Sequence, residues 1–374
     1  MISMEPVLKR GYASWDRDVL PSDEFAARIE AVRAELRAQG LAALVVVNHS
    51  LLGVMVDYAA MAYLTGLQSG GVLLIAADGE PVYISFGGGR ELSFMRTQTW
   101  VSEIVPGGRE AFNVLREQLT ARKIDGGALG TVGVDALAPN PRARLDTALA
   151  GYELRSFDAA LERQRAAKRP REVLAIRLTQ SIVQDAVESA LAEFAAGGDN
   201  TAALIEAERT ARARKARDVR VLASMGSADL RPFEGRLEGR HAPLRIWVAA
   251  QYQGYWAEAA ATWPAPAPNR AADAVRAMQS AAVPGALARD VAAAGLAVLP
   301  REAAESALAY GLGGTIGLAL GEGVPIAPGN ARSLDDGALL ALRCVAHGVE
   351  PSIASRVVSV AAGGARAVEP LRLT

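Results

Sequence analysis

The sequence is poor in cysteine, histidine and aromatic residues. Its 374 residues include one cysteine, Cys344, and three histidines, and aromatic side chains make up 5% of the chain. One cysteine excludes an intrachain disulfide framework and a cysteine-based metal site. No apolar run reaches the roughly 18 residues of a membrane span, and the N-terminus lacks the apolar core of a signal peptide. We therefore expect a cytoplasmic protein with no membrane partner.

The charge balance also excludes a partner class. Forty basic and 41 acidic side chains leave a formal net charge of -1, which gives no electrostatic reason to expect nucleic acid as a partner. The hydrophobic fraction of 51% is that of an ordinary globular protein. Since 374 residues exceed what one hydrophobic core usually spans, we expect two domains.

The first 160 residues have an α/β pattern. Ser22 can cap a helix that ends at Gly40, and Leu41–Val47 follows as a buried strand. A hairpin signal lies around Asp78–Gly79, and short strands such as Thr131–Val134 alternate with helical segments. Residues 1–160 are therefore predicted to form an α/β domain.

The second predicted domain spans residues 161–374 and begins in a charge-dense stretch. Pro170 fits the first turn of a helix over Glu172–Ala196, and Asn200 or Thr201 can cap the next helix. Strands with glycine turns dominate from Val219 onward. Helices followed by strands predict an α+β domain.

The most informative stretch is Leu244–Trp263. Apolar and aromatic positions alternate on both sides of Gln253–Gly254, which predicts a β-hairpin with its turn at these two residues. Glu258 lies in the second strand among alanines and tryptophans. Trp247, with Trp256 or Trp263, can form apolar walls around this carboxylate, which would raise its pKa toward that of a general acid or base.

Several short motifs, in order along the chain, resemble those of the creatinase, aminopeptidase P and prolidase family. They are Tyr63-Leu64-Thr65-Gly66, Lys168-Arg169-Pro170-Arg171-Glu172 with Ile176-Arg177, Gly226 with Pro232, Gly254-Tyr255, and Gly313 with Ile316-Gly317-Leu318. The resemblance implies a pita-bread fold for the C-terminal domain, a creatinase-like N-terminal α/β domain, and a homodimer.

The resemblance also implies where metal ligands would lie. Metal-dependent relatives hold two ions with two aspartates, a histidine and two glutamates, since hard cations need charged oxygen ligands. These five positions fall at Trp247, Glu258, Gly314, Arg343 and Ala354. The histidines that transfer protons fall at Phe233 and Gly321. One carboxylate among five ligand positions cannot hold a metal pair, so we expect no metal and no other cofactor.

The remaining candidates follow from these positions. Glu258, His347 and Glu322 are the candidate catalytic residues, and Arg343, Tyr255, Trp247 and Phe233 are the candidate substrate-binding residues. Arg343 lies inside an apolar run and can fix a substrate carboxylate or pair with Glu258. His49 and His241 lie in predicted loops, and Cys344 in an apolar strand is typical of inert packing.

These positions predict a metal-independent creatinase-like enzyme. Its substrate would be a small carboxylate-bearing amino acid, amide or guanidine derivative, and its reaction C–N bond cleavage or isomerisation by acid and base catalysis. The alternative is a non-catalytic pita-bread protein that binds or scaffolds. A metal-dependent Xaa-Pro peptidase is the least favoured interpretation, because the residues at the ligand positions argue against it.

Overall fold

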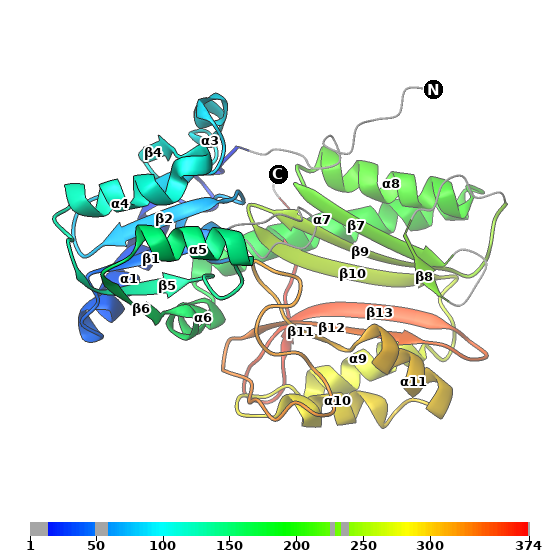
Figure 1. The fold of residues 1–374 in the computed structure, drawn as a ribbon. Coiled ribbons are helices and arrows are strands. Elements are labelled where there is room, and N and C mark those ends of the chain that lie inside the picture. The colour runs from blue at the N-terminus through cyan, green and yellow to red at the C-terminus, as the bar shows by residue number, and fades with distance from the viewer. Residues whose placement is uncertain (1–13, 49–58, 225–228, 233–238, 373–374) are drawn as a thin grey trace. The chain divides into compact units, whose positions relative to one another are not determined.

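The computed structural model describes residues 14–48, 59–224, 229–232 and 239–372 (Figure 1). The chain divides into two compact units, and the change of unit falls between Arg165 and Ala166, within the charge-dense stretch of the sequence. No helix of the described residues is long and apolar enough to cross a membrane.

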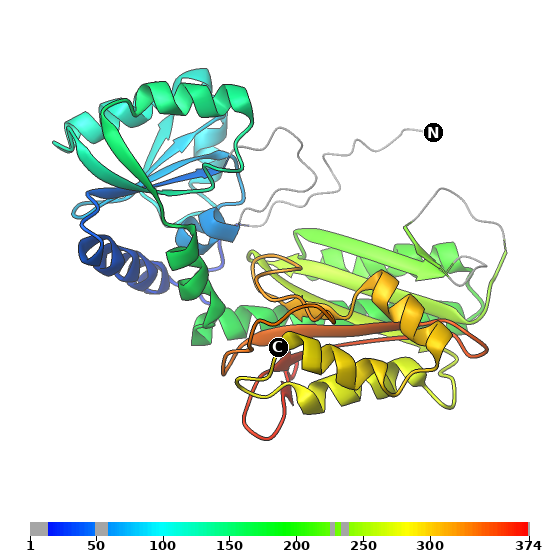
Figure 2. The ribbon, with the colours of Figure 1, turned by 60° about the horizontal axis from the view of Figure 1, so that its bottom comes forward.

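The first unit, Ser14–Arg165, is built on a six-stranded mixed sheet in the order β4-β3-β2-β1-β5-β6. Helices α4 and α5 cover one face of this sheet and α1 the other (Figures 1 and 2). Val45 of β1 packs in one apolar cluster with Phe112 of α4 and Leu145 of α5. The strands are β1 (Ala43–Asn48), β2 (Gly71–Ala76), β3 (Val82–Ser85), β4 (Glu103–Pro106), β5 (Gly127–Val132) and β6 (Tyr152–Ser156). The helices are α1 (Ser22–Ala38), α2 (Ala59–Thr65), α3 (Leu92–Met95), α4 (Ala111–Ala121), α5 (Pro139–Ala148) and α6 (Asp158–Ala166).

The second unit, which includes Ala166–Thr374, contains two four-stranded sheets whose inner faces meet. Helices α7 and α8 cover the outer face of one sheet, and α9, α10 and α11 cover the outer face of the other (Figure 1). The first sheet is β7 (Asp218–Ser224), β8 (Leu230–Arg231), β9 (Leu244–Tyr252) and β10 (Tyr255–Trp263). The second is β11 (Gly313–Thr315), β12 (Leu339–Ala346), β13 (Ser352–Ser359) and β14 (Arg366–Ala367). The helices are α7 (Pro170–Ala195), α8 (Asn200–Ala213), α9 (Arg270–Ala281), α10 (Ala288–Leu296) and α11 (Arg301–Tyr310). The predicted α+β class, with an α/β domain before it, is confirmed.

The central hairpin forms as its sequence predicts. Gln253 and Gly254 have φ angles of 49° and 90°, and Tyr252 pairs with Tyr255 across this two-residue turn. Two consecutive positive φ angles match the twist of the flanking strands, which fixes the register of β9 against β10. Since side chains alternate along a strand, Glu258 shares the inner face with Trp256, and Tyr255 lies on the outer face toward α7.

Helix starts differ in detail from the sequence predictions. Pro170 opens α7, and Glu172 Oε2 accepts a hydrogen bond from Arg169 N at 3.0 Å, which caps that helix. Helix α8 is capped by Asp199, whose carboxylate accepts from Ala202 N at 2.8 Å, instead of by Asn200 or Thr201. Ser22 is the first residue of α1, so the N-cap position is Pro21, which makes no side-chain capping bond.

Candidate functional site

A buried ion pair joins the two sheets of the second unit. Glu258, in the middle of β10, is 0% exposed, and Arg343 of β12 reaches it from the opposite sheet. Arg343 Nη1 donates to Glu258 Oε2 at 2.8 Å. The Arg343 side chain is 26% exposed, so one partner is fully buried while the other still reaches solvent.

The carboxyl of Glu258 is shifted toward its neutral form. Burial raises its pKa, and this effect outweighs Arg343 and the Trp247 indole N–H, which both lower it. A charged carboxylate loses its hydration when it is buried, and one partly exposed guanidinium does not replace all of it. A carboxyl whose pKa is raised in this way is better suited to accept and donate a proton than an ordinary surface carboxylate.

Trp247 flanks the carboxylate from the neighbouring strand. It pairs with Ala260 in the register, which makes it the diagonal neighbour of Glu258 on the inner face. The indole N–H lies close enough to favour the charged carboxylate, yet neither Trp247 Nε1 nor Glu258 Oε1 makes a hydrogen bond with the described residues. The guanidinium carbon of Arg343 lies 5.9 Å from the indole centroid.

Ser355 completes this cluster. It is the direct cross-strand neighbour of Arg343 in β13, so its side chain lies on the same face. Both Ser355 Oγ and Arg343 Nε are buried without a hydrogen-bond partner among the described residues. We call Trp247, Glu258, Arg343 and Ser355 the Glu258 group. Each member carries one buried polar atom without such a partner, and buried polar atoms of this kind are rare in folded proteins.

The structure does not bring Tyr255 or Glu322 into the Glu258 group. Tyr255, on the outer face of the hairpin, donates its hydroxyl hydrogen to Glu172 Oε1 at 3.0 Å and so fixes the start of α7. Glu322 Oε2 accepts from Leu318 N at 2.9 Å and lies 3.5 Å from Lys168 Nζ. Both side chains hold backbone segments in place, and neither is brought to the ion pair.

His347 lies just beyond the C-terminal end of β12, four positions after Arg343. Four positions span about 13 Å in a β-strand. Its ring packs edge-on against Tyr310 at 5.8 Å, and its backbone N–H donates to Ser306 Oγ at 2.9 Å. The side-chain atom His347 Nε2 is buried and has no partner in the described part of the chain. His347 therefore belongs to a separate polar cluster.

The remaining sequence candidates divide clearly. Cys344 points into the apolar core under α9 and α10, and burial raises the pKa of its thiol to about 12, which makes it an unsuitable nucleophile. Trp256 shares the face of Glu258, with the Arg220 guanidinium 4.8 Å from its ring, whereas Trp263 packs on Phe194 of α7. Phe233 and His49 lie outside the described residues.

The residues at the family's ligand positions do not fit a metal pair. Ala354 packs against the apolar cluster that includes Cys344, so the site-facing position of β13 is Ser355, one residue from the predicted position. A Cβ atom on Gly314 would lie 2.8 Å from the Val324 carbonyl oxygen, which leaves no room for a histidine without backbone movement. No group of three potential ligands occurs among the described histidine, cysteine, aspartate and glutamate residues.

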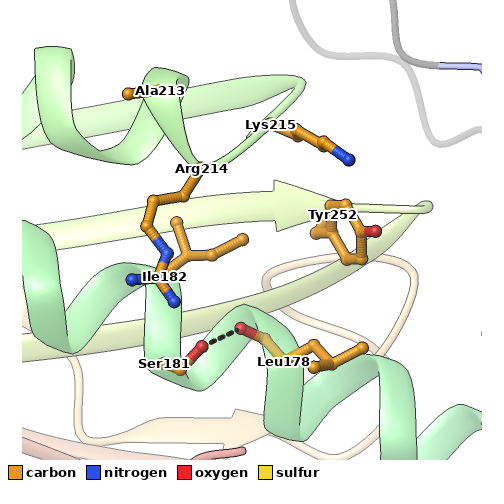
Figure 3. Close-up of a pocket in the computed structure, with 7 residues that line it drawn as sticks. All are labelled: Leu178, Ser181, Ile182, Ala213, Arg214, Lys215 and Tyr252. Carbon is orange, nitrogen blue, oxygen red and sulfur yellow. Dashed lines mark hydrogen bonds between the residues drawn. The ribbon is translucent and has the colours of Figure 1, made fainter. Parts of the chain in front are cut away.

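A cavity of about 240 Å³ lies on the outer side of the first sheet, between α7, the end of α8 and the end of β9 (Figure 3). Its walls combine apolar side chains with the ends of Arg214 and Lys215, and Ser181 Oγ donates to Leu178 O at 2.8 Å. Arg214 is also paired with Asp185. No sequence motif indicated this cavity, since its lining residues come from three separate segments.

Comparison with known proteins places the two units in known folds. Residues 28–167 match the family described as "Creatinase/Prolidase N-terminal domain". X-Pro aminopeptidase from Thermotoga maritima superimposes with a TM-score of 0.75 at 16% identity, covering 92% of this chain and 98% of that one. Xaa-Pro dipeptidase from Bacillus anthracis has a TM-score of 0.71 at 17% identity, covering 94% of this chain and 99% of that one. Dipeptidase PepE from Mycobacterium ulcerans has a TM-score of 0.69 at 21% identity, covering 96% of this chain and 98% of that one. No curated protein sequence matches this chain. Identities this low establish the fold alone.

Proposed function

Because this chain carries the N-terminal domain and the pita-bread fold of the creatinase and prolidase family, we propose that it is a metal-independent enzyme of that fold. Its substrate would be a small carboxylate-bearing amino acid, amide or guanidine derivative. Its reaction would be C–N bond cleavage, or an isomerisation, by acid and base catalysis. The protein would act in the cytoplasm and as a homodimer.

One observation carries this proposal, the fully buried Glu258 with a carboxylate oxygen, Oε1, that has no hydrogen-bond partner among the described residues. A purely structural ion pair is favourable when all its polar atoms are satisfied. A buried carboxylate oxygen without a hydrogen-bond partner in the described part of the chain, such as Glu258 Oε1, can accept a proton or a hydrogen bond from a substrate N–H. Burial raises the pKa of the same carboxyl, which suits it to proton transfer.

The other members of the Glu258 group supply the remaining parts of a hydrolytic step. Trp247 Nε1 and Arg343 Nε are N–H donors without partners in the described part of the chain, and they can stabilise the negative charge that develops on a carbonyl oxygen. The exposed part of Arg343 is available to a substrate carboxylate. Water is the attacking group in this proposal, because the raised pKa of Glu258 suits this carboxylate to accept a proton from water.

For an amide substrate, the proposed step begins with attack of water on the carbonyl carbon. Glu258 accepts a proton from water while the water oxygen forms a bond to the carbonyl carbon. The carbonyl oxygen takes negative charge and is held by the N–H groups of Trp247 and Arg343. The C–N bond then breaks as the proton on Glu258 passes to the nitrogen, which leaves a carboxylic acid and an amine, and Glu258 is again ionised.

Turnover of a panel of N-acyl amino acids, amino acid amides and guanidino acids tests the proposal, with wild type compared to Glu258→Gln. Glutamine keeps the size of the side chain and removes proton transfer, so activity should fall by about a hundredfold or more. Glu305→Gln, at an exposed carboxylate paired with Arg301 on α11, is the control and should keep its activity. Equal turnover in wild type and Glu258→Gln removes Glu258 as the proton-transfer group. Binding without turnover of any panel member identifies a binding protein instead.

A further inference from the structure

The buried polar atoms of the Glu258 group form a specific set of donors and acceptors. Trp247 Nε1 and Arg343 Nε can only donate, Glu258 Oε1 accepts when the carboxylate is ionised, and Ser355 Oγ can do either. The 2.8 Å bond between Arg343 Nη1 and Glu258 Oε2 joins two of these side chains, and Trp247 is the diagonal cross-strand neighbour of Glu258, with its ring centroid 5.9 Å from the Arg343 guanidinium carbon. Two donors and an acceptor therefore lie side by side.

We infer that this group recognises a neutral amide, and discriminates against a guanidinium and against a carboxylate. The inference rests on the proposed function and narrows its substrate class to amides. An amide presents a carbonyl oxygen next to an N–H, so the oxygen accepts from Trp247 and Arg343 while the N–H donates to Glu258 Oε1. Each polar atom of the amide then has a partner in the Glu258 group, and the polar atoms Trp247 Nε1, Arg343 Nε and Glu258 Oε1 each gain one.

A guanidinium is mismatched in two respects. It has N–H donors and no acceptor, so the donors of Trp247 and Arg343 would stay without partners. It would also place a second cation beside the permanently charged Arg343. Both effects oppose binding in a group where Glu258 is already paired with an arginine.

A carboxylate is mismatched in charge. It satisfies the two N–H donors but offers nothing to Glu258 Oε1, and it adds a negative charge next to a carboxylate that is 0% exposed. The ionised pair of Glu258 and Arg343 is neutral as a unit, so a neutral ligand adds no uncompensated charge. The substrate's own carboxylate accordingly belongs at the exposed part of Arg343, away from the buried oxygen.

Acetamide, acetate and guanidinium are the probes of choice because they share one planar, three-armed shape and differ in donors, acceptors and charge. The chain has five tryptophans, so the full-length ¹⁵N-labelled protein has five indole N–H signals, and Trp247→Phe identifies the one that reports on this group. At mildly alkaline pH, acetamide should shift that signal saturably. Its dissociation constant should be at least about tenfold below those of acetate and guanidinium.

Glu258→Gln should change the ranking of the probes. The glutamine side chain can present an N–H donor and removes the negative charge, so Arg343 is left uncompensated and acetate should become the preferred probe. Glu305→Gln, at an exposed carboxylate paired with Arg301 on α11, keeps Glu258 and should leave acetamide as the preferred probe.

Guanidinium binding as tightly as acetamide, or no probe moving the Trp247 signal, overturns the inference. Glu258-dependent turnover of a guanidino acid would overturn it while leaving the proposed function in place. Acetamide selectivity without turnover of any amide would support the inference and contradict the proposed catalytic function.

Discussion

The two faces of the β9–β10 hairpin contrast in how their polar groups are satisfied. On the outer face, Tyr255 donates to Glu172 at 3.0 Å, and Glu172 in turn caps α7 through Arg169 N. On the inner face, Glu258 binds Arg343 with one oxygen and keeps the other without a hydrogen-bond partner in the described residues. Glu172 and Glu258 are thus buried almost equally, at 1% and 0% exposure, but they differ in how many of their carboxylate oxygens accept a hydrogen bond.

This difference separates a structural carboxylate from a candidate functional one. Glu172 accepts a hydrogen bond at both oxygens, and these bonds hold the hairpin to α7. Glu258 and its neighbours retain donors and an acceptor that are costly to leave unpaired in a folded core. A protein tolerates such a cost mainly where water or a ligand completes the group.

Arg343→Met should cause the largest loss of stability, because it removes the ion pair on the inner face of the hairpin. It leaves Glu258 buried without a counter-charge, and such a change costs about 3 kcal/mol of unfolding free energy, less than for a fully buried pair because Arg343 is partly exposed. Urea denaturation measures it. Arg356→Met is the matched control on the adjacent strand, since Arg356 binds Gln279 at the surface, and it should stay within about 0.5 kcal/mol of wild type. Equal losses in both variants would contradict the assigned pair.

Tyr255→Phe should give a smaller effect, confined to the outer face. It removes one hydrogen bond and leaves Glu172 Oε1 without its donor, so the free energy of unfolding should fall by about 1–2 kcal/mol. Acetamide binding, followed at the Trp247 indole signal, should be unchanged. A loss of acetamide binding with unchanged stability would show that Tyr255 contacts the ligand and does not stabilise the fold.

The pH dependence of stability sharpens the contrast further. Burial raises the pKa of Glu258, so the folded state holds the proton more tightly than the unfolded state. The resulting stabilisation is complete below the unfolded pKa and is lost as pH rises through the folded pKa. Wild type should therefore lose stability relative to Glu258→Gln over this interval in denaturation curves at stepped pH. A difference that stays constant, or changes in the opposite direction, would show that the folded pKa is not raised.

Chelation should have the smallest effect, namely none. The Glu258 group offers one carboxylate, and the space at Gly314 is closed by the Val324 backbone. Dialysis against EDTA should leave both the melting temperature and any turnover unchanged. Activity that disappears with EDTA and returns with a transition metal would reverse the metal-independent proposal.

The sequence predicted the hairpin and its turn, because strand alternation and a two-residue turn are local signals. It indicated both members of the ion pair only through the family resemblance, which placed Glu258 and Arg343 at ligand positions of one site. It placed the fifth ligand position at Ala354 instead of Ser355, since a shift of one residue exchanges the two faces of a strand and only the pairing register resolves it. It also counted Tyr255 and Glu322 as candidates. Their partners, Glu172 and Lys168, lie 83 and 154 positions away in the chain, beyond the reach of local patterns.

A high-resolution crystal structure of the protein would test the central claim most directly. We predict ordered water, or a bound small molecule, within hydrogen-bond distance of both Glu258 Oε1 and Trp247 Nε1, with Arg343 still paired to Oε2. A Trp247 N–H that donates straight to Oε1 in a dry, closed cluster would contradict the account, because the inner face would then be as fully satisfied as the outer one.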